Sequence, residues 1–434
     1  MKKTLQFMFI ALLVAFVSLF AHGADKGKIV LTGIVGVSKS EPGYQSHLKV
    51  LERFYQENPD IEIKFDYIAH DTYHTKMQAM VVAGTLPDIL HLWPGKRTGY
   101  ITDKGMALDL RELMDRDGIT DAIPAIQKLP QGPNGEAYEL GVPSIPYSNV
   151  VYANDKLMKK LGLTFPKDIN EFIAQAKVIS DAGYRPLVFG DKSDWVMQSC
   201  MLSLLASRIG GLEWFMDAVT GKASFTDQEF IDALTWIKKM TDSGLISKSE
   251  VNTTRDQAMA MLINDESVYY INGTWDVTNF VNNAPEEVQN NISLHFFPEI
   301  PGQKTVTESS TTAAPTGYGM NVNLEGEKKE AAWKWIKAQV DPSYAELHVA
   351  AGSVPLYLKE DISHLFSNDL VKRLYQHLMA IEENLYVIDD KMDSEGVNSI
   401  VNPGLQELIL GTTTPEELAA KYEAWVAEND SNRK

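Results

Sequence analysis

Hydrophobic and polar positions alternate along the first part of the chain in a way that predicts strands and helices in turn. Residues 29–31 form a short apolar run and 61–65 alternate with a period of two, as strands do. Apolar side chains recur at helical spacing over 44–58 and over about 72–83, and a third strand is predicted over 88–92. This order with short connections indicates a parallel sheet covered by helices.

The same order returns further along the chain. Strands are predicted over 150–152 and 187–189, and helices over 155–161 and 168–182. The segment 305–316 is rich in Thr and Ser and is predicted to be an exposed loop. The overall pattern is that of an α/β protein.

Two capping-box patterns predict where later helices begin. Thr226 is followed three residues later by Glu229, and Thr414 precedes Pro415 and Glu417. In such a box, the hydroxyl of the first residue and the carboxylate of the third helical residue satisfy the free N–H groups of the first turn. We therefore predict helix starts just after Thr226 and Thr414.

The N-terminus has the pattern of a secretory signal peptide. Met1, Lys2 and Lys3 precede an almost wholly apolar stretch over 4–21, and cleavage is predicted between Gly23 and Ala24. The alternative is an uncleaved membrane anchor, which the short apolar stretch disfavours. No later segment offers about 18 consecutive apolar residues, so the mature chain is expected to be soluble.

The only cysteine, Cys200, constrains the compartment further. It lies far from the N-terminus, so it cannot carry a lipoprotein anchor, and a single thiol cannot form an intrachain disulfide. Its apolar surroundings predict a buried, inert thiol. An exported protein without an anchor is expected in a periplasm, with release into the medium as the alternative.

Length and charge bound the classes of function. At 434 residues the chain is too long for one core, so two or three domains are expected. The formal charge is −18, and loss of Lys2 and Lys3 with the signal peptide makes it −20. The chain has no basic cluster, which argues against a nucleic-acid partner. The same charge gives no help in attracting anionic ligands.

Seven segments, taken in this order, resemble the extracellular solute-binding proteins of ABC importers, the group that includes the maltodextrin-binding proteins. The segments are FYQENPDI (54–61), YHTK (73–76), AGTLPDI (83–89), YANDKLMKKLGL (152–163), INGTW (271–275), AAWKWI (331–336) and GSVP (352–355). Each segment alone is unspecific, whereas seven segments in this order are strong evidence for the resemblance. Ala153 departs from the family pattern, which commonly has Tyr or Phe at that position.

The resemblance implies a periplasmic-binding-protein fold, in which two α/β lobes close over a ligand by a hinge movement. It implies three chain crossings, which we place near Asn149, His295 and Asn321. The expected division is a signal peptide over 1–23, a first lobe from 24–149 plus 296–321, and a second lobe from 150–295 plus 322–434. It also implies a monomer that binds a small sugar, passes it to the transmembrane permease subunits of an ABC transporter and catalyses no reaction.

Three tryptophans are the first candidates for ligand contact. Trp93 and Trp275 follow predicted strands, and Trp195 follows a loop. Crevices open at the carboxyl ends of parallel strands, and the apolar faces of a sugar stack on flat aromatic rings. The resemblance separately implies aromatic ligand contacts at Trp93 and Trp275. For all three positions, a half-buried core residue remains the alternative.

Sugar hydroxyls also need polar partners, and four residues are candidates. Glu41 lies in the loop after the first strand, Asn149 lies at a predicted crossing, and Asp194 and Asp276 each adjoin a candidate tryptophan. Arg97 could clamp a carboxylate or a pair of hydroxyls. Each of these residues has an alternative role as a solvated loop residue or a helix cap.

Other functions leave weaker patterns. His70 and His74 have the i, i+4 spacing of metal ligands, but Asp71 stands where the zincin pattern has Glu, and His70 is expected to precede the helix. Neither a phosphate-binding loop nor a serine-nucleophile elbow is present, so we predict no metal, cofactor or catalytic residue. Two alternatives remain open: a binder of another solute, such as a peptide, polyol or uronate, and a secreted carbohydrate-active enzyme using paired carboxylates.

Overall fold

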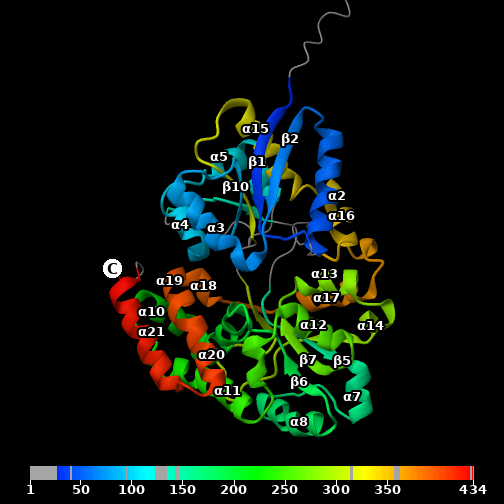
Figure 1. The fold of residues 1–434 in the computed structure, drawn as a ribbon, viewed down its shortest axis with the longest axis vertical. Helices are drawn as coiled ribbons and strands as arrows, with labels where there is room; N and C mark the ends of the chain where they lie inside the picture. The colour runs from blue at the N-terminus through cyan, green and yellow to red at the C-terminus, as the bar shows by residue number, and fades with distance from the viewer. Residues whose placement is uncertain are drawn as a thin grey trace, which may run out of the picture.

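The computed structural model describes residues 27–39, 42–93, 95–122, 134–141, 147–312, 316–355, 362–430 and 433. These residues form two α/β lobes, one above the other in Figure 1, each built on a sheet with helices on both faces. The predicted signal peptide lies outside the described residues. Within them, no helix combines the length and apolar character needed to cross a bilayer.

The sheet of the first lobe has the strand order β2-β1-β3-β10-β4. Its strands are β1 (Ile29–Val35), β2 (Ile61–Tyr67), β3 (Ile89–Leu92), β4 (Leu140–Gly141) and β10 (Gly317–Met320). β1 pairs in parallel with both β2 and β3, which confirms the parallel arrangement predicted for these strands. β10 returns from far along the chain and pairs antiparallel with β3 and β4.

The sheet of the second lobe has the order β6-β7-β5-β8. Its strands are β5 (Val150–Asn154), β6 (Arg185–Val188), β7 (Ser267–Asn272) and β8 (Ile292–His295). β6 and β7 are parallel, whereas β5 is antiparallel to both β7 and β8. A separate pair joins β9 (Ser309–Thr311) to β11 (Glu383–Leu385) in parallel.

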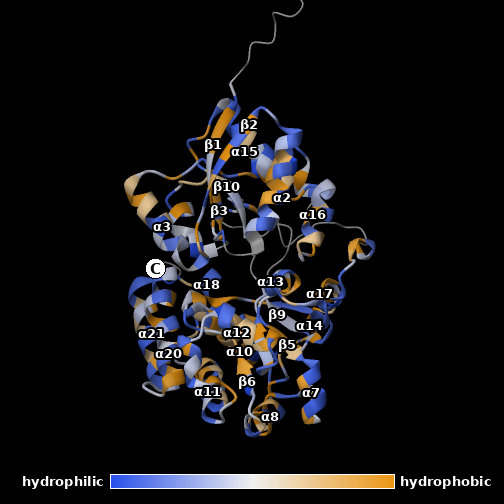
Figure 2. Ribbon diagram, turned by 45° about the vertical axis from the view of Figure 1, so that its right-hand side comes forward, coloured by the Kyte–Doolittle hydropathy of each residue, from blue (hydrophilic) through white to orange (hydrophobic). Residues whose placement is uncertain are grey.

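The central strands of both sheets, such as β3 and β5, are buried on both faces, and their successive residues alternate between two cores. In β5, Val151 and Ala153 enter one core of the second lobe, while Val150 and Tyr152 enter the other. This alternation follows from the period of two along a strand, and burial on both faces explains why the strands read as apolar runs. Figure 2 shows hydrophobic strands inside each lobe and helices with hydrophilic outer sides.

Helices cover both faces of the first sheet. α2, α5 and α15 pack on one face, and α3 and α4 on the other. The elements of this lobe are α2 (Pro42–Glu57), α3 (His70–Ala83), the 3-10 helix η1 (Gly95–Thr98), α4 (Gly99–Thr102), α5 (Arg111–Arg116), α6 (Ile119–Ala122), α15 (Gly326–Ala338), the 3-10 helix η5 (Pro342–Tyr344) and, next to a crossing, α16 (Ala345–Ala350).

The second lobe holds most of the helices. α8, α10, α11, α20 and α21 pack on one face of its sheet, and α12, α13 and α17 on the other. Its earlier elements are α7 (Asp155–Leu161), α8 (Ile169–Asp181), α9 (Trp195–Met197), the π-helix η3 (Gln198–Leu202), α10 (Ser203–Thr220), α11 (Gln228–Asp242), the 3-10 helix η4 (Lys248–Asn252), α12 (Arg255–Ile263), α13 (Asp276–Asn283) and α14 (Glu286–Asn290). Its later elements are the 3-10 helix η6 (Ser363–Leu365), α17 (Asp369–Met379), α18 (Ile388–Lys391), α19 (Ser394–Gly396), the π-helix η7 (Val397–Val401), α20 (Asn402–Leu410) and α21 (Pro415–Asn429).

The helix ends follow local chemistry, with one prediction wrong. Thr414 caps α21 in a complete capping box with Glu417, as predicted. The box predicted at Thr226 is wrong, because α11 begins after Asp227 without a side-chain cap. A complete box not predicted from sequence caps α12, where Thr254 pairs with Gln257.

Two segments differ from their predicted structure. The loop expected over 305–316 contains the buried strand β9, whose side chains are almost fully enclosed by its pairing with β11 and by α10. His70 was expected to precede a helix but is the first residue of α3, after Ala69 at the N-cap. Cys200 is fully buried, as predicted.

The lobes divide the chain differently from the predicted bounds at two places. Phe297 and Ile300 pack into the core of the second lobe, so the second crossing lies between β9 and β10 and not near His295. Helix α15 packs on the first sheet through Trp333 and Trp335, so the third crossing follows it and does not lie near Asn321. Both segments were expected in the other lobe.

Candidate ligand-binding site

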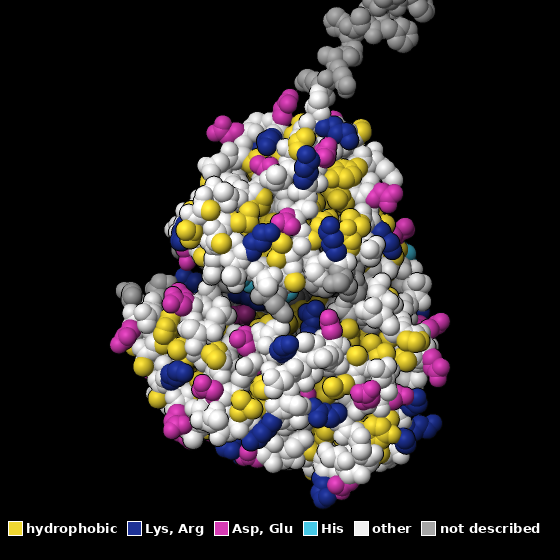
Figure 3. All heavy atoms as spheres, in the orientation of Figure 1, with side chains coloured by type: hydrophobic (Ala, Val, Ile, Leu, Met, Phe, Trp, Pro, Cys, Tyr) yellow, Lys and Arg dark blue, Asp and Glu magenta, His cyan; other side chains and the backbone are white. Residues whose placement is uncertain are grey.

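A cavity of about 360 Å³ lies between the two lobes. The first lobe contributes residues that follow β1 and β3, and the second contributes residues from α9, α12, α13 and α18. The segment after α16 adds Gly352 and Ser353. Figure 3 shows the surface hollowed where the lobes meet. The volume falls within the range of pockets that hold small molecules.

Trp93 lines this cavity directly after β3 ends at Leu92. Its indole packs on Gly36, where a Cβ atom would lie 2.5 Å from the ring. Tyr73, His74 and His91 surround the ring with centroid separations of 4.5–5.0 Å. Trp93 therefore packs in a core of the first lobe and also forms part of the cavity wall. It combines the role of a core residue with that of a candidate ligand contact.

Trp195 and Trp275 face the same cavity from the second lobe. Trp195 is the first residue of α9, and Trp275 comes three positions after β7 ends at Asn272. Their ring centroids are 6.0 Å apart. A Cβ atom at Gly273 would lie 2.2 Å from the Trp275 ring, so this indole, like Trp93, packs on a glycine.

The imidazole of His70 connects the tryptophans of the two lobes. Its centroid lies 5.5 Å from Trp93 in its own lobe and 5.5 Å from Trp195 in the other. Together with the Trp195–Trp275 contact, these distances define an aromatic wall of four rings that crosses from one lobe to the other. His70 and His74 have the spacing of metal ligands in the sequence. In the structure their ring centroids are 6.4 Å apart and the ring planes are at right angles.

Charged groups from both lobes meet at one side of the cavity. Arg97 in η1 pairs with Asp389 in α18 at 3.1 Å, and both side chains are largely buried. Asp390 lines the cavity beside this pair. Burial and the neighbouring Asp389 carboxylate raise the pKa of Asp390, which favours a neutral carboxyl group that can donate a hydrogen bond. Arg97 is thus an interlobe partner rather than the free clamp considered above.

Three further histidines line the cavity in neutral form. Burial lowers the pKa of His47 and of His91 to about 3, and that of His348 to about 4. Nδ1 of His91 accepts a hydrogen bond from the Gly36 N–H at 3.1 Å, and His47 Nδ1 bonds to the Tyr67 hydroxyl. These imidazoles add hydrogen-bonding surface to the cavity without positive charge at neutral pH.

Asn149, Asp194 and Asp276, chosen from the sequence as polar ligand contacts, are not among the residues that line the cavity. Glu41 lies outside the described residues. Asn149 is buried at the first crossing, where its Oδ1 accepts from the Thr311 N–H at 3.2 Å. Asp194 precedes α9 with φ 59° and is not among the lining residues. Asp276 is fully buried and accepts hydrogen bonds from Tyr270 and from Asn279, so it contacts a lining residue and not the cavity.

Several lining residues were not chosen from the sequence. Ser148, Thr274 and Arg255 bring hydroxyls and a guanidinium to the cavity. Thr274 lies between Gly273 and Trp275, and Ser148 lies next to Asn149. Their position in the sequence beside Trp275 and Asn149 was the only feature that could have pointed to them as cavity residues. Arg255 follows the capping threonine of α12, and no local pattern marks it as part of a site.

The arrangement combines flat apolar rings with hydroxyl and imidazole groups and with the guanidinium groups of Arg97 and Arg255. It suits a ligand that has both apolar faces and hydroxyls, which is the character of a carbohydrate. Among the described residues, no group of three or more His, Cys, Asp or Glu side chains could hold a metal ion. The rings of the cavity offer a ligand stacking faces, and its polar side chains offer hydrogen bonds.

The fold and the cavity define a two-lobed binding protein. A family model for bacterial extracellular solute-binding proteins matches residues 38–346. Because this match covers more than half of the chain, the chain belongs to that family, whose members are binding proteins of the extracellular or periplasmic space.

Two relatives of known name match parts of the chain. One is Escherichia coli YcjN, whose name describes an ABC transporter periplasmic-binding protein; it is 22% identical over 223 residues, 49% of each chain. The other is a Mesorhizobium japonicum protein whose name describes a sugar-binding periplasmic protein, 26% identical over 66% of each chain. The chain thus spans about half to two thirds of the length of these relatives.

Solved structures resemble the whole fold. A chitin oligosaccharide binding protein superposes with a TM-score of 0.82 at 20% identity, over 92% of this chain and 98% of its own. The maltose/maltodextrin-binding domain MalE from Bdellovibrio bacteriovorus, bound to maltotriose, has a TM-score of 0.73 at 19% identity, over 92% and 99%. At these identities the likeness shows the two-lobed fold.

Proposed function

We propose that this protein is the substrate-binding component of an ABC importer and captures a small carbohydrate between its lobes. The observation that carries the proposal is the convergence of Trp93, Trp195 and Trp275, from separate parts of the chain, on one cavity of about 360 Å³. Rings from both lobes would hold the sugar faces, and neutral hydroxyl, amide and imidazole groups would bond its hydroxyls. The sugar-binding names of one relative and one structural neighbour support this class of ligand.

Binding between lobes also supplies a mechanism for delivery. A ligand that contacts both lobes stabilises the closed arrangement, and it shifts the population only as far as it prefers that arrangement. The permease subunits would then recognise the closed form and receive the sugar chemically unchanged. We propose a monomeric binding protein for this task, exported by the signal peptide and cleaved near Gly23 and Ala24.

A thermal-shift screen tests the proposal. The purified mature protein is heated with maltotriose, chitin oligosaccharide, xylo-oligosaccharides, raffinose and galactose, and with a peptide, a polyol and a uronate as other solutes. A bound ligand raises stability by about 2.7 kcal/mol at a hundredfold excess over its Kd. A shift with a sugar supports the proposal; a shift only with a peptide, polyol or uronate overturns the ligand class.

The same samples distinguish a binder from an enzyme. Each sugar that shifts the melting temperature is incubated with the protein and then separated by chromatography. Recovery of intact sugar is expected, because delivery to a permease needs no bond cleavage. Appearance of shorter products would instead identify a secreted carbohydrate-active enzyme.

Mass spectrometry tests the proposed cleavage of the signal peptide. The mass of the protein recovered from the periplasm is expected to correspond to a chain that begins at Ala24.

A further inference from the structure

Two cavity residues, Trp195 and Arg255, come from segments that are far apart in the chain but held against each other. The first segment leaves β6 at Phe189, turns at Gly190 and leads to α9, which begins at Trp195. The second runs from η4 to α12, which begins at Arg255. Both Trp195 and Arg255 line the cavity, so the position of these segments shapes one of its walls.

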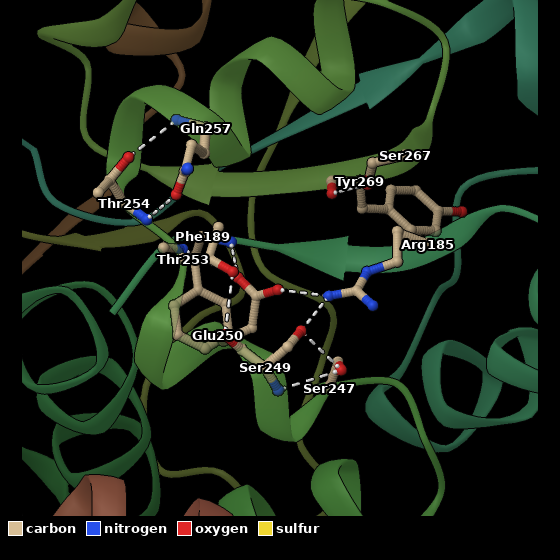
Figure 4. A network of polar contacts seen from close by, with 11 residues as sticks. Arg185, Phe189, Ser247, Ser249, Glu250, Thr253, Thr254, Gln257, Ser267 and Tyr269 are labelled. Atoms are coloured by element: carbon tan, nitrogen blue, oxygen red, sulfur yellow. Dashed lines mark hydrogen bonds and ion pairs between the residues drawn. The ribbon is translucent and has the colours of Figure 1, made fainter. Parts of the chain in front are cut away.

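One buried carboxylate joins the two segments. Glu250, in η4, is fully buried, and its Oε2 accepts hydrogen bonds from the N–H groups of Phe189 and Gly190, each at 3.0 Å. Its Oε1 accepts from the Arg185 guanidinium at 3.3 Å. Figure 4 shows the Glu250 side chain between the Phe189 backbone and the Arg185 side chain. Hydrogen bonds to an ionised carboxylate are about twice as strong as neutral ones.

Backbone contacts extend this attachment toward Trp195. The N–H of Asp191 donates to the Glu250 carbonyl at 2.9 Å, and the N–H of Lys192 donates to the Thr253 carbonyl at 3.0 Å. A Cβ atom at Gly190 would lie 2.4 Å from the Thr254 carbonyl oxygen. The turn at Gly190 therefore packs directly on the capped start of α12, one residue before Arg255.

We infer that Glu250 is a positioning residue for ligand binding, which fixes Trp195 and Arg255 relative to each other without touching the cavity. Glu250 is absent from the cavity lining, and its carboxylate accepts the three hydrogen bonds described above. The inference deepens the proposed function, because it assigns the support of one wall of the same site. It predicts that the wall loosens when the carboxylate is lost, although every lining side chain remains.

The substitution Glu250→Gln tests this inference. Glutamine keeps the size of the side chain but has one acceptor oxygen, so its NH₂ group must face either the two backbone N–H groups or the guanidinium. A matched control is Glu423→Gln in α21. Glu423 likewise accepts from a backbone N–H, that of Phe225 at 2.7 Å, and from a guanidinium, that of Arg433 at 2.6 Å, but it does not line or support the cavity.

Two measurements are made on both variants. Hydrogen exchange of peptides covering 189–197 is expected to speed up in Glu250→Gln and to stay as in the wild type in Glu423→Gln. Titration with whichever of maltotriose, chitin oligosaccharide or xylo-oligosaccharide binds the wild type is expected to give a Kd about tenfold higher in Glu250→Gln only. Unchanged exchange over 189–197, or an unchanged Kd, overturns the inference.

The exchange measurement separates this inference from the proposed function. If no sugar binds the wild type, the proposed ligand class fails, and exchange over 189–197 alone decides whether Glu250 holds the segment. If Glu250→Gln does not fold, Glu250→Asp replaces it, because aspartate keeps the charge but is one methylene shorter, so its carboxylate is drawn away from the Phe189 and Gly190 N–H groups. Wild-type exchange and Kd in folded Glu250→Asp would then overturn the inference.

Discussion

At the residue scale, the aromatic wall depends on glycines as much as on rings. Trp93 and Trp275 each lie on a glycine, Gly36 and Gly273, at distances that leave no room for a Cβ atom. A ring that packs on a glycine backbone has few alternative rotamers, so its face is fixed before a ligand arrives. A rigid face lowers the ordering cost of binding.

Trp195 can be removed from this wall at low cost to the fold, because it is only partly buried. In Trp195→Ala we expect the Kd for the bound sugar to rise at least about tenfold, or ~1.4 kcal/mol, since a stacking face is lost. Calorimetric titration measures the change. Trp236→Ala in α11 is the control, because Trp236 is also partly buried but lies outside the cavity lining. Equal affinities in both variants would contradict a stacking role.

The buried histidines predict how stability depends on pH. Burial holds the pKa of His47 at about 3 and that of His348 at about 4, below the ordinary value of 6.5. The unfolded chain therefore binds protons that the folded chain does not, and stability falls as the pH drops below about 6.5. Urea unfolding at pH 7.5 and pH 5 is expected to show a smaller loss in His348→Gln than in the wild type. His364→Gln, at an exposed position, should retain the wild-type loss, and an equal loss in all three proteins would refute the assignment.

Trp93 and Trp275 could be chosen from sequence because they follow strands, whose carboxyl ends open onto crevices. The polar residues could not be chosen in the same way. Asp276 is the first residue of α13 and adjoins Trp275, yet its side chain turns into the core and bonds to Tyr270. Neighbours in sequence point in different directions, and which direction faces a cavity depends on the packing of the other lobe.

At the element scale, local signals predicted helix ends and the parallel pairing of the first three strands, but they missed a strand whose partner is distant. Gly84 and Gly162 end α3 and α7 in the left-handed conformation, as their positions in the sequence indicate. By contrast, β9 lies in a Thr- and Ser-rich segment and becomes a buried strand only because β11, far along the chain, pairs with it. A strand that depends on a distant partner leaves no periodic pattern of its own.

The capping boxes allow a matched test of a correct and a wrong prediction. In α21 the Thr414 hydroxyl accepts from the Glu417 N–H at 3.2 Å, so Thr414→Ala is expected to lower the free energy of unfolding by about 1 kcal/mol. Thr226 caps no helix and bonds to Ser224, so Thr226→Ala should cost clearly less. Chemical denaturation measures both values. Equal losses would mean that the box at Thr414 contributes nothing specific.

At the scale of the whole molecule, the two lobes contact each other beside the cavity as well as through the rings of the aromatic wall. η1 of the first lobe meets α18 of the second through the Arg97–Asp389 ion pair. The Gly95 backbone, with φ 63°, approaches so closely that a Cβ atom would lie 2.2 Å from the Asp390 carbonyl oxygen. This approach joins residues of different lobes, so it is a contact between the lobes and not part of the fold of either lobe.

Gly95→Ala should therefore impair closure while both lobes stay folded. The added methyl group meets the Asp390 carbonyl of the other lobe, so we expect a larger radius of gyration in X-ray scattering and a Kd for the bound sugar raised about tenfold. Gly84→Ala carries the same backbone strain, since its φ is 66°, but its Cβ would meet no atom within 4 Å. The control should lose similar stability and keep wild-type affinity. If both variants bind equally well, contact between η1 and α18 is not needed for closure.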